Sequence, residues 1–278
     1  MDQIIVVVMP LDKYARNIHY LRISLTDRCN LRCVYCMPED ITFRPQTELI
    51  NKEEILRLAG IFAGLGVDKI RLTGGEPTVH PELVSIVSGL SHTPGIQSVT
   101  MTTNGVLLQE LAEPLKAAGL QRVNISLDSN DPDEFNRIAR REAHEKVWKG
   151  ILAAEKAGLT PVKLNAVIVR GHNDETLLDM AAMTLDHPWY IRFIEMMPFG
   201  GATEFQLHQV VTSHEVMERI ESEFGKLIPE NDGKLDGEAM VFKIPNSLGT
   251  LGFISSVTAP FCSLCTRTRL TSDGKLRL

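Results

Sequence analysis

Three cysteines near the start of the chain have the spacing Cys-x3-Cys-x2-Cys, directly after a strand-like run. They are Cys29, Cys33 and Cys36. A disulfide framework is typical of short secreted chains, whereas this chain has 278 residues and 5 cysteines. Structural zinc takes four ligands, and among the first 50 residues His19 is the one candidate for the fourth. Cubane iron–sulfur clusters normally take four cysteines, so three thiolates leave one iron open to bind a substrate or cofactor.

The turn Gly74-Gly75-Glu76-Pro77 follows the next expected strand along the chain. Its glycines let the backbone approach a ligand closely, and its proline fixes the turn. The Glu76 carboxylate can accept hydrogen bonds from an ammonium group. Because ligand sites in α/β folds collect at the carboxyl ends of parallel strands, this turn and the cysteine segment predict one binding region.

The elements that must position these residues alternate between strands and helices, as the α/β class requires. Strands are expected at residues 20–26, 69–73, 98–103, 122–127, 162–169 and 190–195, and two more at 240–244 and 250–256. Helices are expected from an N-cap at Asn51 to residues 64–66, and at residues 81–90, 107–118, 146–157, 175–185 and 213–224. We expect an N-terminal extension at 1–16, a partial barrel at 17–225 and a C-terminal region at 226–278.

Each expected strand has one aliphatic and one polar face, since side chains alternate between the faces of a strand. The second strand, for example, has Ile70 and Leu72 on one face and Lys69, Arg71 and Thr73 on the other. Strands covered on both faces are nearly continuous apolar runs, and a normal eight-stranded barrel has an aliphatic interior. The polar face therefore predicts an incomplete (βα)6 TIM-like barrel whose interior holds water or a ligand.

Five cations occupy inward-facing positions of this barrel, although the protein has a net charge of -6. They are Arg22, Lys69, Arg71, Lys163 and Arg192. An unpaired buried charge costs several kcal/mol, and the inward acids are too few to neutralise all of these cations. A polyanionic substrate such as a polyphosphate is therefore predicted. Other inward polar residues are interpreted as ordinary satisfied groups, namely Ser24, Thr100 and Asn124.

The cysteine segment, with Tyr35 immediately before its last cysteine, resembles the signature of the radical S-adenosylmethionine (SAM) enzymes. The resemblance implies a 4Fe–4S cluster whose open iron is chelated by the amino and carboxylate groups of SAM. The Gly-Gly-Glu-Pro turn is similar to the superfamily motif that holds the SAM amino group.

A second cysteine pair, Cys262 and Cys265, would in isolation most often indicate half a zinc site or a redox pair. It belongs to a set of motifs along the chain: Thr-Asp-Arg-Cys-Asn at 26–30, Arg-Leu-Thr-Gly-Gly-Glu-Pro at 71–77, Thr-Thr-Asn-Gly at 102–105, Asn-Ile-Ser-Leu-Asp at 124–128, Arg-Phe-Ile-Glu-Met-Met at 192–197 and Phe-Cys-x2-Cys-Thr-Arg-x-Arg-Leu at 261–270. With these motifs, nearly the whole chain, from about residue 17 to residue 278, resembles the GTP 3′,8-cyclase family of molybdenum cofactor biosynthesis.

The resemblance implies roles for particular side chains. The first cluster would be held by Cys29, Cys33 and Cys36, and SAM would be contacted by Tyr35, Gly75, Glu76, Ser126 and Met197. GTP would be contacted by Arg22, Arg71, Thr102, Lys163, Arg267, Thr268 and Arg269. The strand alternation adds Lys69 and Arg192 as phosphate contacts. A second 4Fe–4S cluster, on Cys262 and Cys265, would bind the guanine through its open iron.

The implied chemistry belongs to the cofactors, so no catalytic acid, base or nucleophile is expected among the side chains. Reductive cleavage of SAM gives a 5′-deoxyadenosyl radical, which takes hydrogen from C3′ of GTP, and the resulting carbon radical attacks C8 of guanine. The expected partners are GTP, SAM, an electron donor and the next enzyme of the pathway, and the sequence is compatible with a homodimer. The acidic balance argues against nucleic-acid binding. The apolar run at 4–9 is too short for a membrane span, and we expect a cytoplasmic protein.

The family's second cluster has a third cysteine, which would fall one position after Leu278. We therefore expect a truncated form that assembles the SAM cluster but is impaired in GTP cyclisation. Two alternatives stay open on the sequence: a radical SAM peptide-modifying enzyme with an auxiliary cluster, and a non-enzymatic zinc-binding protein. The first would not need five inward cations, and the second would be colourless where an iron–sulfur protein is brown.

Overall fold

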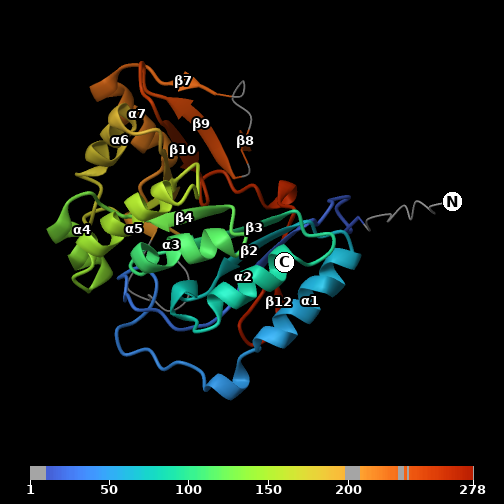
Figure 1. The fold of residues 1–278 in the computed structure, drawn as a ribbon. Coiled ribbons are helices and arrows are strands. Elements are labelled where there is room, and N and C mark those ends of the chain that lie inside the picture. Colours follow the sequence, from blue (N-terminus) through green and yellow to red (C-terminus); the bar gives the residue numbers. More distant parts are fainter. Residues whose placement is uncertain (1–10, 198–206, 231–234, 237, 278) are drawn as a thin grey trace.

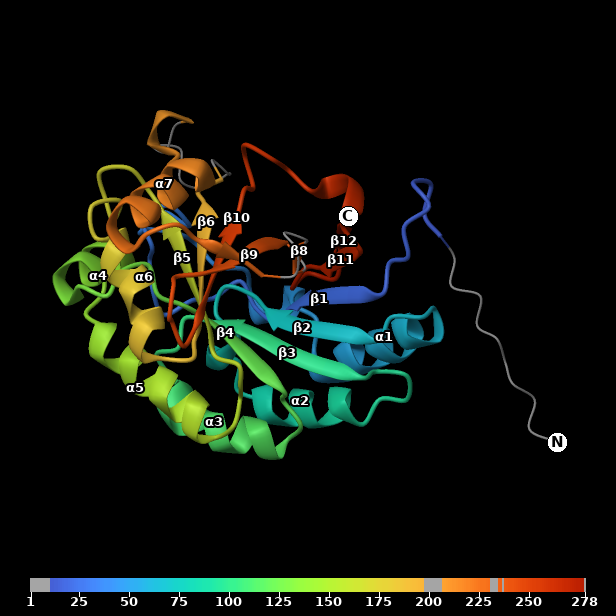
Figure 2. The ribbon, with the colours of Figure 1, turned by 90° about the horizontal axis from the view of Figure 1, so that it is seen from above.

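The structure is a computed structural model that describes residues 11–197, 207–230, 235–236 and 238–277. Its centre is one curved sheet, and the helices lie along the outer face of that sheet (Figures 1 and 2). The expected N-terminal extension lies outside the described residues as far as residue 10.

Six parallel strands form the middle of the sheet in the order of the sequence. They are β1 (Tyr20–Ser24), β2 (Lys69–Thr73), β3 (Ser98–Thr103), β4 (Arg122–Ser126), β5 (Lys163–Ile168) and β6 (Tyr190–Glu195). Their aliphatic residues are fully buried under the helices, as Leu21, Ile70, Val123 and Leu164 show. The expected (βα)6 partial barrel is confirmed, although β1 ends at Ser24 and not at residue 26.

Strands from the C-terminal region extend this sheet at both edges. β11 (Arg267–Leu270) runs parallel to β1, and β10 (Thr250–Ile254) runs parallel to β6. Antiparallel strands complete the sheet: β12 (Leu276–Arg277) beside β11, β9 (Ala239–Lys243) beside β10, and β7 (Ile228–Pro229) and β8 (Leu235–Asp236) beside β9. β11 is not among the strands expected from the sequence, because its residues are mostly polar. Its pairing places Arg269 in register with Arg22, so the C-terminal arginines reach the barrel.

Seven α-helices are present among the described residues. They are α1 (Lys52–Gly64), α2 (Leu83–Ser91), α3 (Leu108–Ala117), α4 (Pro132–Ala139), α5 (His144–Lys156), α6 (Leu177–Asp186) and α7 (Ser213–Phe224). Four short 3-10 helices accompany them: η1 (Gln46–Glu48), η2 (Pro77–Val79), η3 (Leu207–Gln209) and η5 (Cys262–Leu264). α4 is not among the helices expected from the sequence, although its apolar residues Phe135, Ile138 and Ala139 lie on one buried face. Its N-cap, Asp131, accepts a hydrogen bond from the Glu134 amide at 2.7 Å, with Pro132 at the first helical position.

The predicted start of α1 is confirmed by a capping box. The Asn51 side chain accepts from the Glu54 amide at 2.9 Å, and the Glu54 carboxylate accepts from the Asn51 amide at 2.9 Å. Within the ranges that the structure describes, no helix is both long and apolar enough to cross a bilayer.

A buried carboxylate fastens the C-terminal region to the barrel. Glu195 ends β6, is 2% exposed, and accepts hydrogen bonds from the amides of Ser213, Val257 and Thr258 and from the Thr258 hydroxyl, at 2.6 to 2.9 Å. Burial raises the pKa of Glu195, but these hydrogen bonds to its charged form outweigh burial and leave the pKa below its ordinary value. The loop after β10 is thereby joined to the start of α7.

We expect Glu195→Gln to destabilise the protein by about 2 kcal/mol at neutral pH, since an amide group would face backbone donors and leave one of them unsatisfied. A lowered pKa stabilises the fold above the unfolded-state pKa, about 4.3 for glutamate, and that contribution is lost as the pH falls through the folded-state pKa. Thermal unfolding should therefore show a gap between wild type and variant at pH 7 that shrinks below about pH 4.3. The exposed Glu223→Gln is the matched control. A gap that is independent of pH would contradict this role.

Candidate functional site

The three cysteines of the first segment line one cavity at the carboxyl ends of the strands. Its volume is about 150 Å³. The cavity brings together Cys29, Cys33, Cys36, Tyr35, Gly75, Glu76, Thr102 and Ser126, all of which the sequence singles out, and its other lining residues are Leu31, Thr73, Gly74, Thr103, Asn104, Asp128 and Phe135. Met197 is not among the lining residues, and its side chain is exposed. Its contact with SAM stays a prediction.

The cysteine segment is held on two sides by backbone hydrogen bonds. The amides of Arg32 and Val34 donate to the carbonyls at the end of α4, each at 3.0 Å. On the other side, the amides of Gly75 and Glu76 donate to Thr26 and Arg28, each at 2.7 Å. The missed helix α4 and the Gly-Gly turn therefore position the three thiols.

Close approach explains the glycine at position 75. A Cβ atom built there would lie 2.2 Å from the Arg28 carbonyl oxygen and 2.5 Å from that of Asp27. From the sequence, the glycines are expected to let the backbone approach a ligand closely, and that contact stays a prediction. In the structure the nearest atoms belong to the backbone that carries Cys29, so Gly75 lets the turn and the cysteine segment touch.

The Glu76 carboxylate joins the same turn to the end of β3. Oε1 accepts from the Thr78 amide, the Thr78 hydroxyl and the Thr103 hydroxyl at 2.9, 2.5 and 2.6 Å, and Oε2 accepts from the Asn104 amide at 2.6 Å. The side chain is 1% exposed. Glu76 thus positions the loops that surround the cavity, and its contact with the SAM ammonium group stays a prediction.

Asp128 is a site residue that the sequence analysis did not single out. Its Oδ2 accepts from the Tyr35 hydroxyl at 2.7 Å, and its Oδ1 accepts from the Val167 amide at 2.9 Å. Burial raises the pKa of Asp128 to about 6, although both hydrogen bonds favour the charged form. The sequence is enough to place Asp128 on the inward face, because it continues the alternation of Asn124 and Ser126. The pair ties the cysteine segment to the end of β4.

The donor set fits an iron–sulfur cluster. Burial raises the pKa of all three thiols, most strongly that of Cys33, where the charges of Asp128 and Cys36 add to the effect. Three adjacent thiolates therefore require the positive charge of bound metal. The Leu31 amide donates to the Cys29 sulfur at 3.4 Å, and such a hydrogen bond stabilises a thiolate that binds a cluster. In the described part of the chain, no group of three or more His, Cys, Asp or Glu side chains is placed so that it could hold a metal ion.

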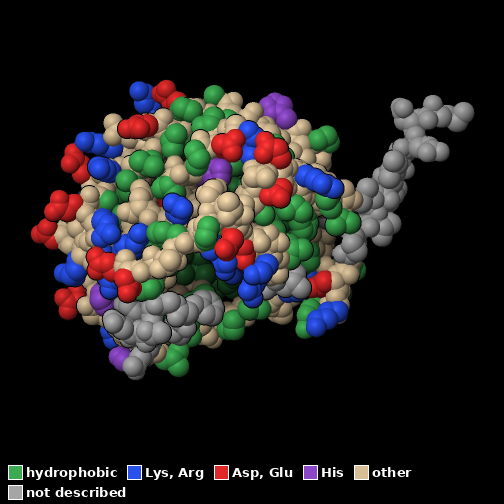
Figure 3. Space-filling model, turned by 90° about the horizontal axis from the view of Figure 1, so that it is seen from below, with side chains coloured by type: hydrophobic (Ala, Val, Ile, Leu, Met, Phe, Trp, Pro, Cys, Tyr) green, Lys and Arg blue, Asp and Glu red, His purple; other side chains and the backbone are tan. Residues whose placement is uncertain are grey.

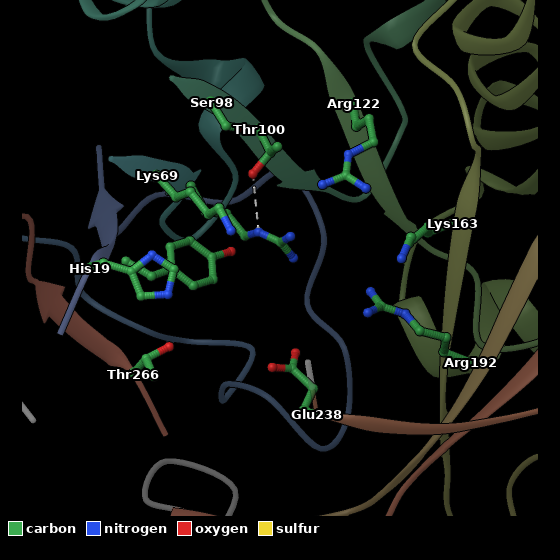
Figure 4. Close-up of a pocket in the computed structure, with 11 residues that line it drawn as sticks. His19, Lys69, Ser98, Thr100, Arg122, Lys163, Arg192, Glu238 and Thr266 are labelled. Carbon is green, nitrogen blue, oxygen red and sulfur yellow. Dashed lines mark hydrogen bonds between the residues drawn. The ribbon is translucent and has the colours of Figure 1, made fainter. Parts of the chain in front are cut away.

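A second, cationic cavity of about 280 Å³ opens at the starts of the same strands. It is lined by His19, Tyr20, Lys69, Arg71, Ser98, Thr100, Arg122, Lys163, Arg192, Glu238 and Thr266 (Figure 4). Four of the five predicted inward cations are among them. The fifth, Arg22, lines a neighbouring cavity with Arg269. Seen from below, the surface has a hollow near its centre with basic side chains at the edge (Figure 3).

Asn124 lies between two of these cations. With its amide oxygen turned toward them, it accepts from Arg71 and from Arg192. The Arg71 Nε also donates to the Thr100 hydroxyl at 3.3 Å, and that hydroxyl donates to the Ile70 carbonyl at 3.3 Å. These contacts agree with the interpretation of Thr100 and Asn124 as satisfied polar groups. Burial, together with the charge of Arg192, lowers the pKa of Arg71.

Glu238 is the acidic side chain in the lining of the cationic cavity, and its carboxylate points into it (Figure 4). It forms an ion pair with Arg267, whose Nε donates to the Cys265 sulfur at 3.3 Å. Burial raises the pKa of Glu238, but Arg267, Arg22 and other cations lower it overall. No sequence pattern marked this residue, because it lies in an irregular stretch between two short strands.

The second cysteine pair lies on the loop that leads into β11. Cys262 is exposed and Cys265 half-buried, and Arg16 donates to the Cys262 carbonyl at 2.6 Å. Burial raises the pKa of Cys265, but the hydrogen bond and charge of Arg267 bring it below its ordinary value. The Thr268 hydroxyl donates to the Arg277 carbonyl at 3.2 Å, so its contact with GTP stays a prediction.

Two family profiles match adjacent parts of the chain. The Radical SAM superfamily matches residues 23–184, and Molybdenum Cofactor Synthesis C matches residues 189–278. The second profile therefore includes the strands that extend the sheet at both edges.

Curated relatives match over nearly the full chain. GTP 3′,8-cyclase of Peptoclostridium acidaminophilum is 46% identical over 270 residues, covering 96% of this chain and 82% of that protein. The enzyme of the same name from Gloeobacter violaceus is 48% identical over 263 residues, covering 94% and 80%. That from Moorella thermoacetica is 47% identical over 267 residues, covering 96% and 82%.

Solved structures share the fold at much lower identity. SuiB of Streptococcus suis has a TM-score of 0.66 at 15% identity, covering 93% of this chain and 59% of that one. Coproporphyrinogen III oxidase of Escherichia coli, a radical SAM enzyme, has a TM-score of 0.55 at 15% identity, covering 87% and 58%. These similarities show the fold alone.

Proposed function

The chain belongs to the GTP 3′,8-cyclase family within the radical SAM superfamily, and on that premise we propose that it converts GTP into (8S)-3′,8-cyclo-7,8-dihydroguanosine 5′-triphosphate. This lyase reaction is the first step of molybdenum cofactor biosynthesis. The observation that carries the proposal is the arrangement of two cavities on the inner face of one sheet. One holds three thiols and the other holds a set of cations.

The first cavity is suited to a 4Fe–4S cluster and SAM. Cys29, Cys33 and Cys36 would hold three of its irons, and Tyr35, Gly75, Glu76, Ser126 and Met197 would surround SAM. When bound, these cofactors supply the 5′-deoxyadenosyl radical that removes hydrogen from C3′ of GTP. The protein's contribution is to fix the distance between SAM and the ribose and to exclude water.

The second cavity is suited to the triphosphate. Lys69, Arg71, Lys163 and Arg192 line it, and Arg22, Arg267 and Arg269 lie beside it on β1 and β11. Phosphate oxygens would take the place of the carboxylate of Glu238 among these cations. Thr102 lines the cluster cavity on β3, two residues beyond Thr100 of the cationic cavity, so it lies where the ribose would join the two.

Cys262 and Cys265 are proposed to supply ligands for a second 4Fe–4S cluster that holds the guanine. The hydrogen bond from Arg267 to the Cys265 sulfur supports this proposal, because it favours the thiolate that metal binding requires. We also propose a one-electron donor of low potential, a consuming enzyme that acts on the cyclic nucleotide, a cytoplasmic location and a homodimer.

Isotope transfer tests the proposed reaction. The protein is reconstituted anaerobically with iron and sulfide and supplied with SAM, a reductant and GTP deuterated at C3′. We expect deuterium in the 5′-deoxyadenosine and a cyclised triphosphate in the mass spectrum. GTP deuterated at C2′ is the matched control and should give unlabelled 5′-deoxyadenosine. SAM cleavage that GTP leaves unstimulated and unlabelled would contradict the proposal and favour another substrate.

A further inference from the structure

Arg122 is the first residue of β4, and its guanidinium points into the cationic cavity (Figure 4). It has the same strand parity as Asn124 and Ser126, although the sequence analysis did not include it among the inward cations. The residue is half-buried. Its charge therefore belongs to the cavity as much as those of Arg71 and Lys163 do.

Three other arginines near this cavity have partners within the protein, whereas Arg22, in the neighbouring cavity, has a buried Nε without a hydrogen-bond partner. Arg71 and Arg192 share the amide oxygen of Asn124, and Arg267 is paired with Glu238. Within the described ranges, no hydrogen bond, ion pair or ring contact reaches the guanidinium of Arg122. Its five donors are therefore available to an anion from outside the chain.

The position of Arg122 along its strand indicates which part of a substrate it meets. Ser126, on the same strand face, lines the cluster cavity, where the ribose must lie for the reaction. Ser126 and Arg122 are four positions apart, which amounts to about 13 Å at roughly 3.3 Å per residue. The group of a nucleoside triphosphate that is farthest from the ribose is the terminal phosphate. Asn124 lies between the two levels on the same strand face, and the guanidinium of Arg71, which donates to Asn124, would meet a phosphate nearer to the ribose.

We propose that Arg122 binds the terminal phosphate and makes the cavity select a triphosphate over a diphosphate. This inference rests on the proposed function, which places a nucleotide in the cavity. The planar guanidinium can donate two parallel hydrogen bonds to phosphate oxygens, which a lysine at the same position could not match. Arg122 is in this sense a specificity-determining residue and not a group that takes part in the chemistry.

The test measures dissociation constants for GTP and GDP with the wild-type protein, Arg122→Ala and Arg122→Lys. We expect Arg122→Ala to bind GTP about 10-fold more weakly, the effect of one charge-assisted hydrogen-bonded contact, and to bind GDP within about 2-fold of wild type. Arg122→Lys should fall between wild type and Arg122→Ala for GTP. The exposed Arg57→Ala, on α1, removes the same charge far from the cavity and should change neither constant. Equal weakening of GTP and GDP by Arg122→Ala, or no weakening of either, overturns the inference.

A parallel titration with inorganic tripolyphosphate and pyrophosphate separates this inference from the proposed function. Selection of tripolyphosphate that is lost in Arg122→Ala supports the role of Arg122, even if the protein were to bind no GTP. Failure of the wild type to bind GTP, with tripolyphosphate selection intact, would overturn the proposed substrate alone. Thermal unfolding of each variant identifies a loss of affinity that comes from misfolding, and the lysine variant then decides the result.

Discussion

Gly75→Ala reduces SAM cleavage by at least about 100-fold and prevents normal assembly of the first cluster. This is the result that we expect from the contact between the Gly-Gly turn and the cysteine segment. A methyl group at this position would meet the Arg28 carbonyl oxygen at 2.2 Å, where both partners are backbone. Overpacking of this kind costs about 1–3 kcal/mol and is relieved only by movement of the chain. The movement displaces Cys29, and with it the geometry of all three thiols.

Iron content, the visible absorption of the cluster and the rate of reductive SAM cleavage measure the effect. Gly60→Ala is the matched control, because a Cβ atom at Gly60 meets nothing within 4 Å and the residue lies inside α1. That variant should be slightly more stable than wild type, since alanine is the better helix former by about 1 kcal/mol. Wild-type iron content together with SAM cleavage within threefold of wild type in Gly75→Ala would show that the contact does not position the cysteines.

Arg71→Ala is expected to weaken GTP binding by about 100-fold, since hydrogen bonds to charged groups contribute roughly 1.5–3 kcal/mol and each 1.4 kcal/mol is a factor of ten. Arg71 lies in the middle of the cationic cavity and is held there by Thr100 and Asn124. Arg71→Lys keeps the charge and should lose about 10-fold, because it cannot use the same fork of donors. Titration calorimetry with GTP gives both values.

Glu238→Gln is a control that should change GTP affinity in the opposite direction. Removing its carboxylate takes a competing anion out of the cavity and leaves Arg267 without its partner in the free protein, and both effects favour a bound phosphate. GTP should therefore bind more tightly, while the free protein melts at a lower temperature. Glu223→Gln, at an exposed position, should change neither the GTP affinity nor the melting temperature. If Arg71→Ala binds GTP within threefold of wild type, the proposal that the triphosphate lies in this cavity is contradicted.

Most of the barrel could be predicted because its strands follow simple rules. Alternation of aliphatic and polar residues in β1 to β6 identified both the strands and the face that points inward, and four of five predicted cations line one cavity. The capping box at Asn51 fixed the start of α1 for the same reason, since it depends on two residues three positions apart. Patterns of this kind can be predicted because they depend only on residues that are close together in the sequence.

Features that depend on distant parts of the chain could not be predicted. Glu238 enters the cavity only because β9 pairs with β10 and β10 with β6, a placement that no short motif encodes. The close approach of Gly75 to the backbone of Arg28 could not be predicted for a similar reason, because the two residues are far apart in the sequence, and the contact of Gly75 with SAM stays a prediction. Arg122 and Asp128 are different cases. Both obey the alternation that identifies the other inward residues, so the sequence alone is enough to place them on the inward face.

The strands that extend the sheet at both edges have a consequence for how the protein folds during synthesis. β1 and β6 emerge from the ribosome well before their outer neighbours β11 and β10, so for a time the nascent barrel exposes two unpaired edges. Exposed edges invite pairing with other chains, and contacts between residues as far apart as Arg22 and Arg269 form slowly. The arginines of β11 reach the cavity only at that last step. The chain therefore cannot present a complete phosphate site before its sheet is protected against aggregation.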